Sequence, residues 1–430
     1  MEVELNLPNG PRQGVHPLSH QQQALLALRI DDGPHRTCPT TFAVRVNNVD
    51  ARRLARAIAC LGQRHPALRT AIGEHGGRWH QWVAADSVPL AVLDTRALAV
   101  LSPLAGARSW ARTQRIDLDG RTCLTRWALI PGTDYDVLVL AAHPMALDSW
   151  SWGLLLHELA GAYRDPRTLG PVPPAYSDYT RWQHSTPNPG HHLHLNEATD
   201  HLGAQNALRL PGAAAYPPAI GTTRTVTFAV PPAAAEQIRN LARQTSVTMF
   251  HLVVALCSAS IAQWAQANDF VVASTAINRE PGTEAIVGLF TTRRLTHVRV
   301  GHGTTPMKLA EQIRDRWLDT GAWPRTRIDT DLAAQSRTAI EINYNDVATL
   351  RAPLPAIGAV PATAVEIGET RTSATHLAVS LTPDRTGGLA VSLTYRIDIL
   401  TRSGARAVAA AVQQSLLKVS ALGTEGAGRG

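Results

Sequence analysis

The sequence predicts an α/β protein of two lobes, each a mixed sheet covered by helices. Its 430 residues are too many for one ordinary hydrophobic core and are enough for two. Strand and helix patterns alternate from about residue 17, and a stretch rich in proline and glycine interrupts them at residues 184–192. We therefore predict an N-terminal lobe over residues 1–183, a linker over 184–192, a C-terminal lobe over 193–422 and a flexible tail over 423–430.

The N-terminal lobe is expected to open with a strand and an amphipathic helix. TFAVRVNNV at residues 41–49 is typical of a strand, and Asp50 after it is a candidate N-cap. Apolar residues then recur with helical spacing at Leu54, Ala57, Ile58 and Leu61. RWHQWVA at residues 78–84 predicts another strand, and RWALIPG and YDVLVLAA flank the turn Pro131-Gly132 as a hairpin or as neighbouring strands.

The clearest helix pattern lies in SWGLLLHELAGAY at residues 151–163. Either Ser149 or Ser151 can cap its start. Its apolar stripe comprises Trp152, Leu155, Leu156, Leu159, Ala160 and Tyr163. His157 and Glu158 fall off this stripe, so we expect both to face solvent, and His157 stays a candidate for a substitute base.

The C-terminal lobe repeats this style without repeating the sequence. TRTVTFAV at residues 223–230 predicts a strand, and PAAAEQIRNLARQT predicts a helix. VTMFHLVVALCSASIAQW is apolar nearly all round, which is typical of a buried helix. Further strands are predicted in DFVVAST, HVRVGHG, AIEINYND and HLAVSLTPDRTGGLAVSLTYRID, with a turn at Gly387-Gly388, and a last helix in SGARAVAAAVQQSLLKVSAL.

The charge and apolar patterns exclude several classes of function. The formal net charge is +7, and Lys308 and Lys418 are the only lysines among the basic residues. The arginines are scattered and form no stripe, which argues against nucleic-acid binding, whereas a basic surface suits an acidic protein partner. No apolar run reaches the roughly 18 residues that span a membrane. The N-terminus has no secretory signal, so we expect a cytoplasmic protein.

Metal sites and disulfides are not expected. The cysteines are Cys38, Cys60, Cys123 and Cys257. They form no CxxC pair, which predicts buried free thiols. The histidines His191, His192 and His194 lie in a polar segment rich in turn formers, without a carboxylate at ligand spacing. We therefore expect a loop there and no metal site.

Six segments resemble those of one family and stand in its order. They are HPLSHQQQALLAL, RHPALRTAI, RIDLDGRTCLTRWALI, AYSDYTRWQ, DFVVASTAINRE and IVGLFTTRRL. From about Pro17 to Leu422 the chain thus resembles the condensation domains of nonribosomal peptide synthetases. The resemblance implies two chloramphenicol-acetyltransferase-like lobes in a V-shaped pseudo-dimer with a central tunnel. It also implies that carrier proteins bring phosphopantetheine-tethered substrates to the two ends of the tunnel, with no cofactor bound to the chain itself.

The stretch VLVLAAHPMALDSWSW at residues 137–152 corresponds to the HHxxxDG motif of that family. In active members the acceptor amine attacks the donor thioester there. Aligned without gaps, the catalytic second histidine is replaced by Pro144 and the glycine by Ser149. Proline cannot take a proton, and general acid–base catalysis is worth about 10² to 10⁴ in rate. Positioning of two tethered reactants supplies an effective molarity of about 10⁵ to 10⁸ M, so the loss weakens amide formation without forbidding it.

Three other residues of the motif region carry expectations from the resemblance. Asp148 is retained and in the family pairs with an arginine from the second lobe, here Arg279, in a structural contact that we expect to be bidentate. Ser149 and the following Trp150 are expected to line the tunnel, where the serine side chain would narrow the passage.

Two histidines are candidates for a remaining base. His143 resembles a scaffold residue of the family, with a catalytic role as the alternative. His376 lies in SATHLAVSL, a segment that lines the tunnel in relatives, and is a candidate replacement base.

The resemblance leaves two classes of function open. The altered motif favours a recruitment or scaffold protein that binds a carrier protein and a cytochrome P450 or other tailoring enzyme. The apparent free-standing length favours an acyltransferase or cyclising enzyme that forms an amide or ester from carrier-bound thioesters, by proximity or with a substitute base. A relative acting on coenzyme A esters is a weaker third alternative, because SDYTRWQ favours the condensation branch. The sequence favours the first.

Overall fold

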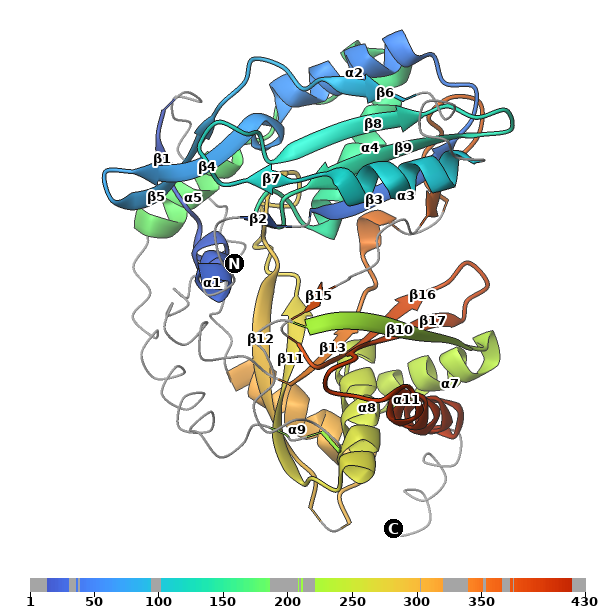
Figure 1. Cartoon of the computed structure of the whole chain (residues 1–430). Coiled ribbons are helices and arrows are strands. Elements are labelled where there is room, and N and C mark those ends of the chain that lie inside the picture. The colour runs from blue at the N-terminus through green and yellow to red at the C-terminus, as the bar shows by residue number, and fades with distance from the viewer. Residues whose placement is uncertain are drawn as a thin grey trace. The chain divides into compact units, whose positions relative to one another are not determined.

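The computed structural model describes residues 14–30, 36–37, 39–93, 102–185, 208, 210–211, 221–301, 303–319, 339–350, 353–365, 372–373 and 375–419. The chain divides into two compact units. Figure 1 shows the described elements coloured by residue number. Unit 1 comprises Met1–Asn188, Asn278–Thr291 and Val347–Glu369. Unit 2 comprises Pro189–Ile277, Thr292–Asp346 and Thr370–Gly430. Two segments from the second half of the sequence therefore pack in unit 1, while the predicted lobe boundaries stay a prediction.

The described elements of unit 1 follow the predicted alternation of strands and helices. They are β1 (His16–Pro17), α1 (His20–Ile30), β2 (Arg36–Thr37), β3 (Thr40–Val46), α2 (Ala51–Arg64), η1 (Pro66–Arg69), β4 (Thr70–His75), β5 (Arg78–Val83), β6 (Leu90–Val92), α3 (Pro103–Thr113), β7 (Ile116–Asp117), β8 (Thr125–Ile130), β9 (Asp136–Ala142), α4 (Ser149–Arg164), η2 (Pro166–Thr168), α5 (Tyr176–Ser185), η4 (Ala348–Leu350) and β14 (Thr363–Val365).

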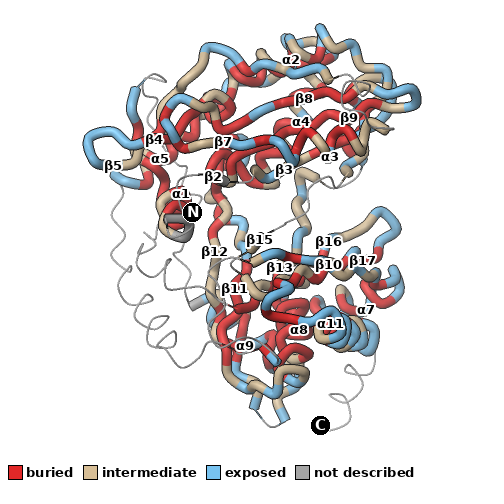
Figure 2. The backbone as a smooth tube through the Cα atoms, in the orientation of Figure 1, coloured by how far each residue is buried: buried red, intermediate tan, exposed pale blue. Residues whose placement is uncertain are grey.

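The main sheet of unit 1 has the strand order β14-β3-β9-β8-β6. β9 pairs antiparallel with both β3 and β8, so the predicted neighbouring strands around Pro131-Gly132 are present. Every residue of β9 is buried (Figure 2), because α2 and α4 cover one face of the sheet and α3 covers the other. This double burial explains why the strand is apolar without alternation.

Local sequence signals account for α2 as predicted. The Asp50 side chain caps the helix by accepting a hydrogen bond from the backbone N–H of Arg53. The predicted stripe of Leu54, Ala57, Ile58 and Leu61 is buried.

Two expectations about α4 are wrong. Its N-cap is Asp148, and neither predicted serine, because the carboxylate accepts a hydrogen bond from the backbone N–H of Ser151. Glu158 does not face solvent freely: its side chain pairs with Arg64 at 2.9 Å and His65 at 2.5 Å. His157 is exposed, as expected.

The described elements of unit 2 are β10 (Gly221–Val230), α7 (Pro232–Gln244), α8 (Met249–Ala265), β11 (Asp269–Ala276), β12 (Thr292–Arg299), α9 (Pro306–Asp319), β13 (Ile340–Tyr344), β15 (Thr372–Ser373), β16 (Leu377–Pro383), β17 (Leu389–Arg396) and α11 (Arg402–Leu417). Its strands form one mixed sheet in the order β12-β11-β13-β16-β17-β10-β15. The helices cover one face of this sheet, and α8 is buried as its apolar pattern predicts (Figure 1). The α/β fold class is thereby confirmed.

Some predictions fall partly or wholly outside the described residues. They concern the linker beyond residue 185, the tail over 423–430, Cys38, and the histidines at 191, 192 and 194. Of the other cysteines, Cys257 is buried as expected, whereas Cys60 and Cys123 are only partly buried. In the described part of the chain no cluster of three or more His, Cys, Asp or Glu is placed to hold a metal. There, no single helix is long and apolar enough to cross a membrane, and only the bent pair α7 and α8 passes that test jointly.

Candidate functional site

The junction between β9 and α4 is a tight turn with Pro144 in its second position. The N–H of His143 donates to the carbonyl of Leu124 at 2.8 Å, which keeps the chain in line with the sheet. The N–H of Ala146 donates to the carbonyl of His143 at 2.8 Å, closing a β-turn. Proline suits the second position of such a turn because its φ is fixed near the required value and its missing N–H is not needed.

His143 is a buried part of this turn. Its side chain is fully buried, and its Nδ1 accepts a hydrogen bond from the N–H of Met145 at 3.2 Å. An imidazole that accepts through Nδ1 carries its proton on Nε2 when neutral. The ring therefore belongs to the internal bonding of the turn.

A buried glutamine of α1, Gln22, holds the same turn and is itself bonded by Gln81 of β5. The side-chain amide of Gln22 donates to the carbonyl of Met145 at 3.0 Å. Gln81 donates to the Gln22 side chain at 3.0 Å and to the carbonyl of Pro17 at 2.9 Å. The sequence analysis did not identify these glutamines as site residues. Gln22 lies in the family-like segment HPLSHQQQALLAL, whereas Gln81 lies in the predicted strand RWHQWVA.

Asp148 is the most heavily bonded side chain of the junction. One carboxylate oxygen accepts from the N–H and the hydroxyl of Ser151, both at 2.8 Å, and from Arg279 at 3.1 Å. The other oxygen accepts from the N–H of Phe290 at 3.1 Å. The carboxylate thus joins the start of α4 to the segment 278–291 inside unit 1.

Arg279 completes a buried ion pair with Asp148. Their side chains are only 4% and 1% exposed. One terminal nitrogen reaches Asp148, while the other donates to the carbonyls of Thr283 at 2.7 Å and Ile286 at 2.8 Å. The contact is therefore not bidentate as expected, because two backbone carbonyls take the second nitrogen. Burial lowers the pKa of Arg279, and the charge of Asp148 opposes that shift. The guanidinium also lies 4.0 Å from the ring centre of Phe290.

Ser149 and Trp150 form the first residues of α4, and both are partly buried. Ser149 takes up helical backbone geometry there, so a serine in place of the motif glycine causes no backbone strain. The indole N–H of Trp150 donates to the carbonyl of Glu284 at 3.0 Å, and its own carbonyl accepts from the Thr349 hydroxyl at 3.0 Å. Pro144, Ser149, Trp150 and the Asp148–Arg279 pair therefore share one region of unit 1.

His376 lies in unit 2, directly before β16. Its carbonyl accepts from the N–H of Arg396 on the neighbouring strand at 3.0 Å. Its Nδ1 is buried and has no hydrogen-bond partner within the described residues. Burial and the positive charge of Arg396 lower the pKa of His376, and Asp398 opposes them. The lowered pKa favours the uncharged form of the ring.

Residues 12–425 match the family model of the condensation domain. The chain belongs to the condensation-domain family. It is 28% identical over 341 residues to the isonitrile lipopeptide synthase of Mycobacterium tuberculosis, covering 71% of this chain and 13% of that protein. The chain spans between 4% and 29% of the length of its first curated relatives.

Solved structures share the fold at low identity. The complex of the X-domain and OxyB from teicoplanin biosynthesis has a TM-score of 0.74 and 19% identity, covering 98% of this chain and 96% of that chain. SgcC5 from Streptomyces globisporus also has a TM-score of 0.74 and 19% identity, covering 94% of this chain and 98% of that chain. The alignment of this junction with the family motif HHxxxDG, which places Pro144 at the second histidine, stays a prediction from the sequence.

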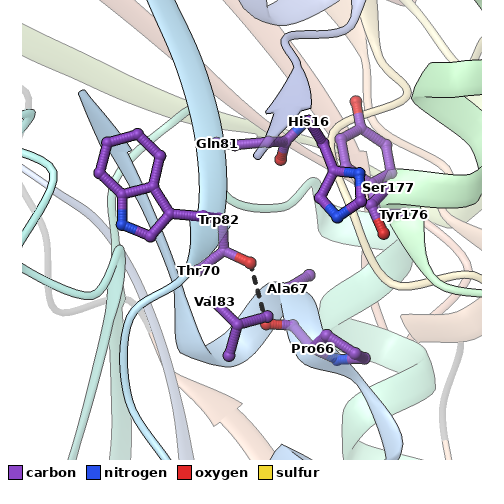
Figure 3. Close-up of a pocket in the computed structure, with 9 residues that line it drawn as sticks. All are labelled: His16, Pro66, Ala67, Thr70, Gln81, Trp82, Val83, Tyr176 and Ser177. Carbon is purple, nitrogen blue, oxygen red and sulfur yellow. Dashed lines mark hydrogen bonds between the residues drawn. The ribbon is translucent and has the colours of Figure 1, made fainter. Parts of the chain in front are cut away.

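A small pocket in unit 1 brings three of the family-like segments together (Figure 3). Its lining comprises His16, Pro66, Ala67, Thr70, Gln81, Trp82, Val83, Tyr176 and Ser177. It offers only about 10 Å³ to the centre of a water molecule, which is room for about one water. A phosphopantetheine arm is far larger than this volume.

Proposed function

We propose that this chain is a condensation-type protein of nonribosomal peptide biosynthesis that engages carrier-protein-bound substrates and recruits a partner enzyme, a cytochrome P450 or another tailoring enzyme. The usual histidine-dependent amide-forming activity is lost or altered. The observation that carries this proposal is the junction between β9 and α4, where the framework is complete and the base position holds Pro144.

The framework of the junction does not need a base at position 144. Backbone groups of His143 and Ala146 close the turn, and Asp148 fixes the helix start through four donor groups. Pro144 offers no proton acceptor, and the Nδ1 of His143 is already bonded to a backbone N–H. Without a base, amide formation loses a factor of about 10² to 10⁴.

The recruitment role draws support from the likeness to the X-domain. That X-domain was solved in a complex with OxyB, and it matches this chain over 98% of its length. A condensation-type fold therefore has a precedent as a partner of a second protein. By analogy, we propose the same class of role for this chain, with a carrier protein supplying the substrate.

The alternative function is an acyltransferase or cyclising enzyme. It would form an amide or ester by proximity of tethered reactants, or with a substitute base. The observation that favours it is His376, whose lowered pKa favours the uncharged ring and whose Nδ1 has no partner in the described part of the chain. A neutral imidazole is a competent general base.

Turnover with phosphopantetheine-loaded carrier domains separates the two functions. The wild type, His143→Ala and His376→Ala would be incubated with loaded donor and acceptor carriers, and product release followed by mass spectrometry. Pull-down of carrier domains and cytochromes P450 would be measured in parallel. Binding without turnover supports the recruitment role. Turnover that either histidine variant abolishes contradicts it and establishes the enzyme. If the wild type shows no binding and no turnover, both functions are refuted.

A further inference from the structure

The N-terminal half of α2 and the end of α4 carry a group of exposed arginines. We call this group the α2 arginine surface and define it as Arg52, Arg53, Arg56 and Arg164, all exposed. Figure 2 shows the outer side of α2 as exposed. The two helices pack on each other within unit 1, so these residues belong to one rigid part of the fold.

The position of Arg52 opposes the dipole of α2, whereas Arg164 lies in the last turn of α4, where a cation is favourable. The first turn of α2 contains Arg52 and Arg53 and no acidic residue. The N-terminal end of a helix bears partial positive charge, so cations there are unfavourable. The N-cap Asp50 compensates in part: the N–H of Arg53 and the charges of Arg56 and Arg52 lower its pKa. A local preference that is violated without an evident gain in the fold indicates a functional position.

One of the four arginines has a clear structural role, and two have none. Arg53 donates to the carbonyls of Tyr163 and Arg164, the latter at 2.6 Å, and so places its cation at the C-terminal end of α4. Arg52 and Arg56 make no hydrogen bond or ion pair with any of the residues that the structure describes. Their guanidinium groups are therefore available to a carboxylate outside the chain.

We propose that the α2 arginine surface is a docking site for a carboxylate-rich face of the carrier protein. The inference rests on the proposed function, because the carrier is the partner proposed there. Charge complementarity supports it, since the chain carries a net charge of +7 and the surface presents four cations, with Asp50 and Asp165 as neighbouring carboxylates. Bidentate hydrogen bonds between guanidinium and carboxylate groups would fix the orientation of the docked carrier protein. Their opposite charges would also raise the association rate at low ionic strength.

Charge reversal with a matched control tests the docking site. The variant R52E/R56E of the full chain would be compared with R108E/R112E, which changes the same charge on exposed arginines one turn apart on α3 of the same unit. A panel of phosphopantetheine-loaded carrier domains is the probe, and Kd is measured by calorimetry at about 50 mM and about 500 mM salt.

We expect R52E/R56E to raise Kd about tenfold at low salt, with less than a twofold change in the control variant. The difference between the variants should shrink at high salt because screening weakens exposed charge pairs. The unfolding temperature of R52E/R56E should stay close to that of the wild type, because both side chains are exposed. A merely structural role for these arginines would lower it.

Two results would overturn the inference. Wild-type binding that R52E/R56E leaves unchanged, or that both variants weaken equally, refutes the docking site and leaves the proposed function standing. A wild type that binds no carrier domain refutes the proposed function and the docking site with it.

Discussion

A histidine at position 144 should add a proton acceptor to the junction without disturbing its fold. Pro144 occupies the second position of the turn closed between His143 and Ala146, and that position accepts most residues. Proline stabilises such a site mainly by restricting the unfolded chain, by about 0.4–1 kcal/mol. Pro144→His is therefore expected to lower the unfolding temperature by about 1–4 °C.

The same variant should recover catalysis if a base is all that the junction lacks. General base catalysis supplies about 10² to 10⁴ in rate, so amide formation from loaded carriers should rise by that factor. Pro144→Ala is the matched control, because it loses the same restriction of the unfolded chain and offers no proton acceptor. The double variant P144H/S149G, which completes the family motif, tests whether the Ser149 side chain also limits turnover. Product formation by the wild type and the three variants is measured by mass spectrometry of single-turnover reactions.

Two outcomes would refute this reasoning. If Pro144→His and Pro144→Ala both bind carriers and show the same turnover, the missing histidine does not explain the activity of this chain. If Pro144→His loses its cooperative unfolding transition while Pro144→Ala keeps it, the turn does not accept a histidine as its geometry predicts.

Three further predictions concern stability. Asp148→Asn should destabilise unit 1 by about 3–5 kcal/mol in urea unfolding, because Arg279 stays buried without its counter-charge; a loss under 1 kcal/mol would contradict the buried pair. Burial alone would raise the pKa of Glu158, but its hydrogen bonds and charged partners hold it below the ordinary value. Its stabilising effect is thus present above about pH 4.5 and fades as the pH falls. Glu158→Gln should therefore reduce the change of the urea midpoint between pH 5 and pH 3. A pH dependence equal to that of the wild type would contradict this. Gly288→Ala should lower the free energy of unfolding by about 1–3 kcal/mol through overpacking, because a Cβ there would lie 2.0 Å from the Tyr176 ring. Gly170→Ala is the control and should leave stability unchanged, because a Cβ there meets nothing within 4 Å. Equal shifts of the unfolding temperature in the two variants would disprove the packing argument.

Local signals in the sequence were sufficient for individual elements. The helix α2 was predicted with its cap Asp50 and its buried stripe, because capping and periodicity depend only on neighbours in the chain. The turn at Gly387-Gly388 was likewise predicted, and Gly387 has the positive φ of 89° that favours glycine.

Long-range partners explain what the sequence did not reveal. Glu158 looked solvent-exposed from its helical spacing, but Arg64 and His65 reach it from α2 and the residue after it. The Gln22–Gln81 pair also joins segments that are distant in the chain, and no periodicity marks it. A helical or strand period shows which face of an element is buried, and it does not show which core the element joins.

The two halves of the motif differ in what the fold demands of them. At position 144 the turn uses no side chain and no backbone N–H, so the fold places almost no demand on the residue there. At position 148 the carboxylate receives four hydrogen bonds and balances a buried cation, so its loss is severe. The presence of Asp148 therefore follows from the stability of unit 1 and carries no information about catalysis. Only residues that the fold does not need, such as Arg52 and Arg56 on the surface, can report on what this protein binds.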